Sequence, residues 1–471
     1  MLFNSFEFVF FLPLVLAGHW LLRGRWRTGL LLVASYLFYG WWDPRFLGLI
    51  ALSTLIDYVV ALGIGSSDVE TRRRLLLGVS LVANLGILFA FKYSGFFVES
   101  AVELLESLGL EANPPFLRIV LPVGISFYTF QTISYTFDVF RRRIEPSRDL
   151  LTFGLYVAYF PQLVAGPIER ARELLPQLEA ERRFPDRQKI LSGLVLIAMG
   201  LFKKVAIADV MAPIVNIAFA APGNQSSLSL LVGVYAFALQ IYGDFSGYTD
   251  VARGTSRLFG IELMRNFEQP YLSRNITEFW RTWHISLSNW LHDYLYIPLG
   301  GNRKGSTRTY VNLMIVMVLG GLWHGAAWTF VIWGFLHGAF LAIHRMIGNY
   351  SPRGYQGRFG ARRDWLPTLV TFNLVCFAWI FFRAPQISSA VDYVRGLFSF
   401  TAGLPPTSWM TLLVPAMLIV LVIDIAQRNS NDHEVILTWR PLAQGFAYAV
   451  FFLGVLVFSG GPAVPFIYFQ F

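Results

Sequence analysis

The chain has 471 residues, of which 55% are hydrophobic and only 14% are charged, and its formal net charge is +9. Soluble domains carry about 25% charged residues, which argues against a soluble domain with a single anchor. Apolar stretches of about 20 residues recur along the chain, the length that a helix needs to cross a bilayer. The basic residues lie in short loops between these stretches, as the positive-inside rule requires, so the charge does not indicate nucleic-acid binding. The composition therefore predicts an all-α polytopic membrane protein.

The predicted membrane segments follow one another without a linker, so residues 1–471 are expected to form a single membrane domain. The basic loops between them are assigned to the cytoplasm. An acidic loop from Val98 to Pro115, which lacks lysine and arginine, is assigned to the outer side. The single cysteine, Cys376, lies in an apolar stretch and allows no intramolecular disulfide. About eleven spans are predicted, near residues 6–22, 28–42, 46–64, 75–97, 117–140, 190–219, 228–246, 311–345, 367–383, 408–425 and 441–459.

Two further apolar segments, near residues 150–168 and 282–300, have basic loops on both sides. Because both ends of each segment belong in the cytoplasm, we expect them to be re-entrant or interfacial. Irregular backbone at membrane depth is tolerated only inside protein or beside water, so they predict a central tunnel or cavity entered from the cytoplasm. The 35 residues from 311 to 345 exceed one straight span, so they are expected to tilt, break or fold back, with Gly334 and Gly338 as the candidate break points.

The stretch GGLWHGAAWTFVIWG, from Gly320 to Gly334, places His324 inside an apolar segment. Counted from Val311 at 1.5 Å per residue, His324 lies roughly 20 Å along the predicted helix. Trp328 is expected on the same helix face, and small residues around it allow other helices to approach closely. A neutral, hydrogen-bonded core histidine is the alternative to a functional one. An imidazole with a pKa near 6.5 can act as a general base at neutral pH.

A second histidine, His284, lies in NITEFWRTWHISLSNWLHDYLYIPLGGNRKG. If this segment is one helix, Trp280, His284, Ser288 and His292 form a single row at intervals of four residues. The alternative is an interfacial belt of aromatic rings anchored by arginines. The predicted re-entrant topology favours a functional histidine, because a belt does not need histidines on one face.

Charged residues inside spans are costly, and Asp244 in ALQIYGDFSGYTD is the clearest case. An ion pair between Asp244 and Arg253 or Arg257, near the membrane edge, is the simplest expectation. This pair would shape the cavity without acting on a substrate.

The loop GGNRKGSTR, from Gly300 to Arg308, is basic and can bind phosphates through charge and backbone N–H groups. It lacks the Gly-Lys-Ser/Thr order of a Walker A motif, and an ordinary positive-inside loop explains it equally well. The chain also contains no G-x-S-x-G nucleophile elbow, no H-E-x-x-H motif and no cluster with the spacing of metal ligands. No metal site is therefore predicted.

Several long motifs resemble the membrane-bound O-acyltransferase family, in particular its bacterial branch that includes alginate O-acetylase. The resemblance covers nearly the whole chain. It is carried by YLFYGWWDPRF, LPVGISFYTFQTISYTFDVFR, YFPQLVAGPI, DFSGYTDVARG, NFEQPYLSRNITEFWRTWHISLSNWLHDYLYIPLGGNR and GGLWHGAAWTFVIWG.

The resemblance implies an acetyltransferase of the bacterial inner membrane that takes acetyl groups from a cytoplasmic thioester and delivers them for O-acetylation of an exopolysaccharide. His324 matches the family's catalytic histidine and His284 its second functional histidine. The C-terminal tail motif, residues 465–471, resembles the tyrosine motif of this branch, which implies that Tyr468 carries the acyl group. Contacts to donor or substrate are further predicted at Trp323, Trp328, Asp244, Arg303 and Lys304.

No bound cofactor is predicted, and acetyl-CoA is the expected donor substrate, with an acyl carrier protein as the alternative. The resemblance implies periplasmic SGNH-type acetyltransferases and polysaccharide export machinery as partners, together with membrane lipid. Alginate is the first choice of glycan, and peptidoglycan, cellulose and teichoic acid remain open. Other classes of function are a secondary transporter that uses its membrane histidines and Asp244 as a proton relay, and an assembly scaffold.

Overall fold

The structure is a computed structural model that describes residues 1–111, 120–348, 359–360, 362–460 and 464–469. Packing divides the chain into two compact units. The first unit comprises Met1–Ile190 and Thr255–Met264, and the second comprises Leu191–Gly254 and Arg265–Phe471. The expectation of one membrane domain over residues 1–471 stays a prediction.

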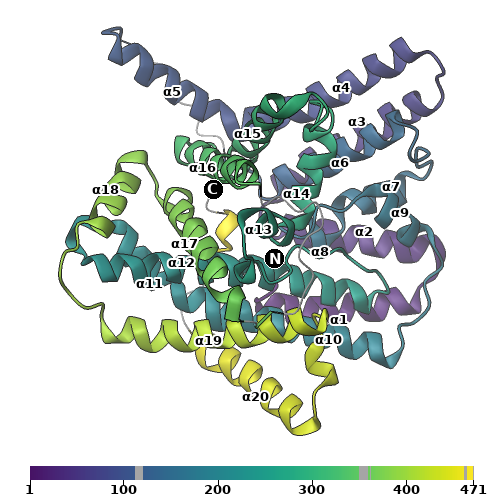
Figure 1. The fold of residues 1–471 in the computed structure, drawn as a ribbon. Helices are drawn as coiled ribbons and strands as arrows, with labels where there is room; N and C mark the ends of the chain where they lie inside the picture. The colour runs from purple at the N-terminus through teal and green to yellow at the C-terminus, as the bar shows by residue number, and fades with distance from the viewer. Residues whose placement is uncertain (112–119, 349–358, 361, 461–463, 470–471) are drawn as a thin grey trace. The chain divides into compact units, whose positions relative to one another are not determined.

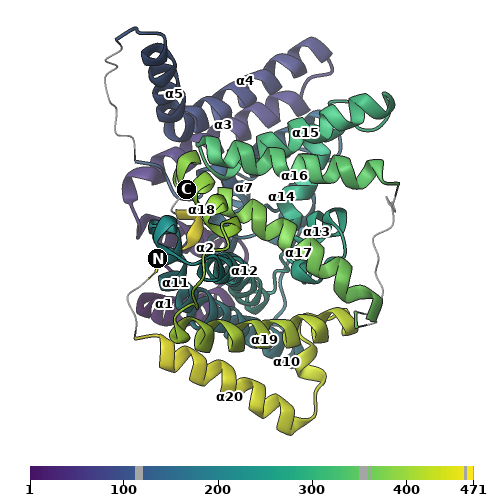
Figure 2. The same ribbon diagram turned by 60° about the vertical axis from the view of Figure 1, so that its left-hand side comes forward.

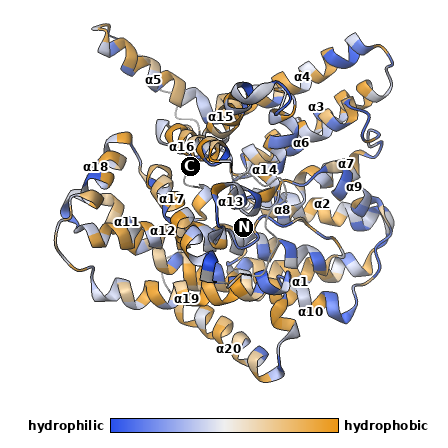
Figure 3. Ribbon diagram, in the orientation of Figure 1, coloured by the Kyte–Doolittle hydropathy of each residue, from blue (hydrophilic) through white to orange (hydrophobic). Residues whose placement is uncertain are grey.

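The secondary structure of the described residues is helical, without a β-strand, which confirms the all-α prediction (Figure 1). Within the part of the chain that the structure describes, seven helical stretches are long and apolar enough to cross a membrane. Apolar residues cover most of the length of α19 and α20 in Figure 3. A multi-pass membrane protein is thus confirmed, whereas the predicted number of eleven spans is not. The seven stretches are Pro44–Gly65, Glu70–Ser107, Arg187–Ala220, Ser227–Leu258, Arg363–Arg383, Thr407–Ser430 and Pro441–Phe458.

Buried polar contacts join three helices of the first unit. The carboxylate of Asp57 on α3 accepts hydrogen bonds from Asn84 on α4 (2.8 Å) and Thr136 on α6 (3.1 Å). Buried polar groups need such partners, so these bonds favour one register of the three helices. The helices of this unit are α1 (Phe6–Leu21), α2 (Gly24–Gly40), α3 (Leu47–Gly65), α4 (Glu70–Leu88), α5 (Ser94–Ser107), α6 (Ile125–Phe140), α7 (Leu150–Ala158), α8 (Phe160–Leu163) and α9 (Ala171–Glu179).

Two predictions fall in the first unit. The acidic segment from Val98 to Pro115 is not a loop throughout, because α5 continues to Ser107. Its glutamate and leucine residues favour a helix, and the charge of a segment does not determine its conformation. Residues 112–119 lie outside the described part of the chain, and so does part of the predicted span 117–140. The segment 150–168 contains only the short helices α7 and α8, each too short to span a bilayer. Its re-entrant position in the membrane stays a prediction.

The second unit contains the long helix α12, which carries Asp244, and the hairpin of α15 and α16, which carries His324. Its helices are α10 (Arg187–Phe202), α11 (Asp209–Ala220), α12 (Ser227–Leu258), α13 (Ile276–Thr282), α14 (Ile285–Leu291), α15 (Gly305–His324), α16 (Trp328–Met346), α17 (Arg362–Arg383), α18 (Ile387–Phe398), α19 (Thr407–Ser430) and α20 (Pro441–Phe458). The site region also includes two short π-helical segments, η3 (Lys203–Ala208) and η6 (His292–Tyr296), and the 3-10 turn η8 (Ile467–Phe469).

The prediction that residues 311–345 break or fold back is confirmed, since α15 and α16 run side by side in both ribbon views (Figures 1 and 2). The predicted break points are wrong: the chain turns at 325–327, directly after His324. Gly334 and Gly338 lie inside α16, where they allow close packing instead of a break. A Cβ at Gly334 would overlap the carbonyl oxygen of Met317 on α15.

The segment around His284 is also not one helix. α13 ends at Thr282, α14 begins at Ile285, and His284 between them has left-handed backbone angles (φ 44°, ψ 55°). The predicted row of Trp280, His284 and Ser288 on one helix face is therefore wrong. Left-handed backbone is unfavourable for residues other than glycine and persists only where the surroundings impose it. Here the amide of Ile285 donates to the carbonyl of Asn266 (2.9 Å), next to an isolated β-bridge between Phe267 and Trp283. These contacts hold the break between α13 and α14.

Candidate active site

Three aromatic rings from distant parts of the second unit meet beside α12. The ring centroid of His324 lies 5.7 Å from that of Tyr468 and 6.1 Å from that of His284. The centroids of His284 and Tyr468 are 6.4 Å apart. His324 is the last residue of α15, His284 lies between α13 and α14, and Tyr468 lies on the turn η8, drawn in yellow near the C label of Figure 1. Folding thus brings together the three residues that the sequence singles out.

Large aromatic side chains surround these three rings. Phe245 on α12 lies between two of them, with its ring 4.7 Å from His284 and 4.6 Å from Tyr468. Trp323 contacts both histidine rings, at 5.6 Å from His284 and 5.1 Å from His324. Trp333 and Phe382 also contact the His324 ring, at 5.0 and 5.3 Å. Such a wall keeps bulk water away, which strengthens every electrostatic interaction inside it.

The hydroxyl oxygen of Tyr468 is buried among these rings. Tyr468 lies outside the candidate spans, and desolvation, followed by the Asp244 carboxylate, raises the pKa of its phenol well above the ordinary value. A phenol in this position is protonated at neutral pH and becomes a nucleophile only if a base removes its proton. The two neighbouring imidazoles are the groups that can do so.

A cavity of about 640 Å³ reaches this cluster from one side, and His324 and Trp333 form part of its wall. Its volume lies within the range of about 300–1,000 Å³ that is usual for ligand sites. Three arginines line it, Arg281, Arg303 and Arg345, so it suits an anionic ligand. The cavity connects a basic rim with the imidazole of His324.

The residues predicted to contact donor or substrate do not all lie at this site. Trp323 packs against both histidines and Arg303 lines the cavity. Lys304 is exposed and is absent from the cavity lining. Trp328 does not share a helix face with His324, because the helix ends before it, and 49% of its surface is exposed.

Asp244 lies beside the C-terminal tail, and its predicted pairing with Arg253 or Arg257 is wrong. Its carboxylate pairs instead with Lys204 on η3, at 3.0 Å, and accepts a hydrogen bond from the backbone amide of Ile467, at 2.6 Å. The arginines lie two and more helical turns further along α12, beyond reach of the Asp244 carboxylate. Nothing in the sequence relates Lys204 to Asp244, since they are 40 residues apart.

Two further histidines of the second unit, His337 and His292, occupy different environments. His337 on α16 is fully buried, accepts a hydrogen bond from the Trp280 indole (3.2 Å) and stacks on Phe279. This is the hydrogen-bonded core histidine that was the alternative interpretation for His324. His292 lies on η6, in contact with Asp293 (2.9 Å), and lines the cavity.

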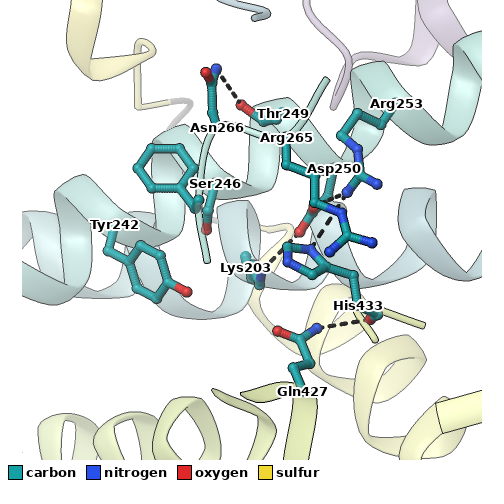
Figure 4. A pocket seen from close by; sticks show the side chains of 11 residues that line it. Lys203, Tyr242, Ser246, Thr249, Asp250, Arg253, Arg265, Asn266, Gln427 and His433 are labelled. Atoms are coloured by element: carbon teal, nitrogen blue, oxygen red, sulfur yellow. Dashed lines mark hydrogen bonds and ion pairs between the residues drawn. The ribbon is translucent and has the colours of Figure 1, made fainter. Parts of the chain in front are cut away.

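A second, much smaller pocket of about 10 Å³ lies further along α12 (Figure 4). Lys203 and Asp250 form a buried ion pair across it at 2.7 Å, and Arg253 lies 3.7 Å from the same carboxylate. His433 is buried here, and its backbone oxygen accepts a hydrogen bond from Gln427 (2.8 Å). A pocket of this size holds at most about one water molecule, so it does not fit a substrate. The described residues hold no cluster that could bind a metal ion.

Comparison with known proteins identifies the family of this chain. Residues 45–384 match the membrane-bound O-acyltransferase family. The chain belongs to this family. It is therefore an O-acyltransferase, a multi-pass membrane enzyme, as the resemblance implied.

Several similar proteins are named for the acylation of alginate, peptidoglycan or teichoic acid. The chain is 40% identical to "Probable alginate O-acetylase AlgI" of Pseudomonas putida over the full length of both chains. It is 36% identical to a peptidoglycan O-acetyltransferase of Helicobacter pylori, over 84% of this chain and 80% of that one. A teichoic acid D-alanyltransferase of Bacillus subtilis is 25% identical over 57% of this chain and 70% of its own length. The alginate relative spans the C-terminal tail, beyond the segment that matches the family.

Proposed function

We propose that this O-acyltransferase takes acetyl groups from a cytoplasmic thioester and passes them across the bacterial inner membrane for O-acetylation of an exopolysaccharide, with alginate as the first candidate. The observation that carries the proposal is the meeting of His324, His284 and Tyr468 next to a cavity rimmed by arginines. Full-length similarity to a probable alginate O-acetylase supports the choice of polymer.

The cavity supports acetyl-CoA as the donor. CoA carries phosphates at one end and a thioester at the other, and guanidinium groups bind phosphates well. With its phosphates near Arg281, Arg303 or Arg345, the thioester end would point towards His324. An acyl carrier protein presents the same thioester on a phosphorylated arm, so it is the alternative donor.

In the proposed reaction the Tyr468 oxygen attacks the thioester carbonyl. The phenol proton passes to an imidazole, for which His324 is the candidate because it lies both near Tyr468 and in the cavity wall. The C–S bond then breaks, the proton moves to the leaving thiolate, and the products are acetyl-Tyr468 and CoA thiol. His284 contacts the Tyr468 ring from the other side and would orient it.

The acetyl group would leave Tyr468 for a hydroxyl of an acceptor at the outer face. We propose a periplasmic SGNH-type acetyltransferase as that acceptor, acting together with polysaccharide export machinery. Because relatives act on peptidoglycan and teichoic acid, those polymers and cellulose are the alternative final acceptors. Membership in an O-acyltransferase family favours an enzyme over a transporter or a scaffold.

The test is mass spectrometry of the C-terminal peptide after incubation of purified protein with isotope-labelled acetyl-CoA. Label on Tyr468 is expected in the wild type and absent from Tyr468→Phe and His324→Ala. Label in Tyr468→Phe, or unchanged acetylation of the polymer by cells that carry this variant, would overturn the carrier role. Adding a purified acyl carrier protein charged with labelled acetate separates a different donor from a direct transfer.

A further inference from the structure

The C-terminal tail is held through its backbone by a buried ion pair. Lys204 donates from Nζ to the carbonyl oxygen of Val464 (3.1 Å), while Asp244 accepts from the amide of Ile467 (2.6 Å). The two side chains pair with each other at 3.0 Å. One cation and one anion thus contact two backbone groups that lie three residues apart, directly before Tyr468.

This ion pair is built into the interior of the second unit. The exposed fractions of the Lys204 and Asp244 side chains are 12% and 3%. Asp209 also pairs with the Lys204 ammonium, at 2.7 Å. Hydrogen bonds with an ionised partner are shorter and stronger than those between neutral groups, and a dry interior strengthens them further.

We propose that Lys204 and Asp244 are positioning residues that hold the tail so that the Tyr468 phenol faces the two histidines. The inference rests on the proposed carrier role of Tyr468 and extends it to residues that do not touch the reacting atoms. Asp244 restrains the amide of Ile467, and the next residue is Tyr468. Phe245, the neighbour of Asp244 on α12, packs against the Tyr468 ring, so one turn of α12 contacts both the backbone and the ring of the tail.

The geometry explains why this restraint matters for acyl transfer. The described part of the tail contains a single short turn, η8, and its phenol must meet a thioester and a base at once. A misplacement of about 1 Å in a reacting group can lower a rate by roughly 100-fold. Because Lys204 and Asp244 hold the backbone of the tail, they restrict the Tyr468 ring without occupying the space that the acetyl group needs.

Asp250 is a matched control on the same helix. It forms an equally buried ion pair with Lys203, the residue before Lys204, at 2.7 Å. The described contacts of this second pair are with α12 and the small polar pocket of Figure 4, and the tail is not among the residues lining that pocket. Substitution of Asp250 removes a buried carboxylate but leaves the contacts of Lys204 and Asp244 with the tail backbone intact.

The first test is hydrogen exchange of the C-terminal peptide, measured by mass spectrometry on the full-length protein in detergent. In Asp244→Ala, we expect the Ile467 amide to exchange at least tenfold faster than in the wild type, and Asp250→Ala to leave it unchanged. Asp244→Asn keeps an acceptor oxygen and should give an intermediate rate, which also serves if the alanine variant does not fold. If the Ile467 amide exchanged at the wild-type rate in both Asp244 variants, the inference would be overturned. The same holds if Asp250→Ala accelerated this exchange as much as Asp244→Ala.

The second test separates positioning from donor binding. With acetyl-CoA as the probe, Asp244→Ala should label Tyr468 roughly 100-fold more slowly at saturating donor, with an unchanged KM, because Asp244 does not line the donor cavity. A raised KM with an unchanged maximal rate would overturn the positioning role. If the wild type is labelled neither by acetyl-CoA nor by a charged acyl carrier protein, the carrier proposal fails, but the exchange test still decides whether the ion pair holds the tail.

Discussion

Two buried polar clusters lie on α12, six residues apart, and their surroundings are opposite in character. Asp250 is surrounded by charged and polar side chains, including Lys203, Arg253 and the buried His433. Asp244 lies at the edge of a cluster of aromatic rings that contains His284, His324 and Tyr468, and it contacts the chain that carries the tyrosine.

From this difference we propose that the Asp250 cluster supports stability and that the histidine cluster supports the chemistry. A dense ion-pair network compensates its own charges and leaves no room for a ligand, so the Asp250 cluster suits a structural role. Imidazoles and a phenol in an aromatic wall beside a large cavity can instead exchange protons with a bound substrate. Buried histidine and buried carboxylate occur in both clusters, so residue type alone does not separate them.

The largest expected difference is between the two buried histidines. His324→Ala should lower the rate of Tyr468 acetylation by about 10²–10⁴-fold, the usual contribution of a general base. His433→Ala should leave the rate within a few-fold of the wild type, because the ring lies in the Asp250 cluster. The measurement is the initial rate with labelled acetyl-CoA. Equal losses in the two variants would remove the distinction between the clusters.

For stability we expect the opposite: a substitution in the Asp250 cluster should destabilise the protein more than a substitution in the histidine cluster. Lys203→Met leaves the Asp250 carboxylate without its closest partner, and breaking a buried pair costs about 3–5 kcal/mol. Tyr468→Phe removes one hydroxyl and should change stability far less. Thermal unfolding of both purified variants in the same detergent checks this. A larger loss in Tyr468→Phe would mean that the tail, and not the Asp250 cluster, stabilises the second unit.

A third variant tests whether the histidine cluster depends on the packing of its hairpin. Gly334→Ala would force α16 away from the Met317 carbonyl of α15, and overpacking costs about 1–3 kcal/mol. We expect lower stability together with slower acetylation, because His324 ends α15. Gly445→Ala in α20, where the added carbon meets nothing within 4 Å, is the matched control and should lower neither the stability nor the acetylation rate.

The smallest expected effect concerns the cavity rim. Arg303→Ala should raise the KM for acetyl-CoA by up to about tenfold, equivalent to about 1.4 kcal/mol, since it removes one charge from the lining. Lys304→Ala, one residue further, removes an exposed charge that does not line the cavity and should leave KM unchanged. Equal shifts in both variants would indicate general attraction by the basic loop instead of a defined contact.

The sequence by itself determined the fold class and the family. Span-length apolar runs leave no soluble alternative, because a backbone in lipid must satisfy its hydrogen bonds within helices. The motifs around His284 and His324 are long and contiguous, so they identify an O-acyltransferase without any contact between distant residues. The same motifs single out both histidines as candidates, and the tail motif singles out Tyr468.

Only the tertiary structure decided how those candidates are arranged and supported. The break after His324, the left-handed backbone at His284 and the partners of Asp244 all depend on contacts between segments far apart in the sequence. Gly334 shows the reason: a glycine in an apolar run predicts either a kink or close packing, and only the neighbouring helix selects between them. In the same way, two adjacent lysines acquire separate roles because each side chain points to a different carboxylate of α12.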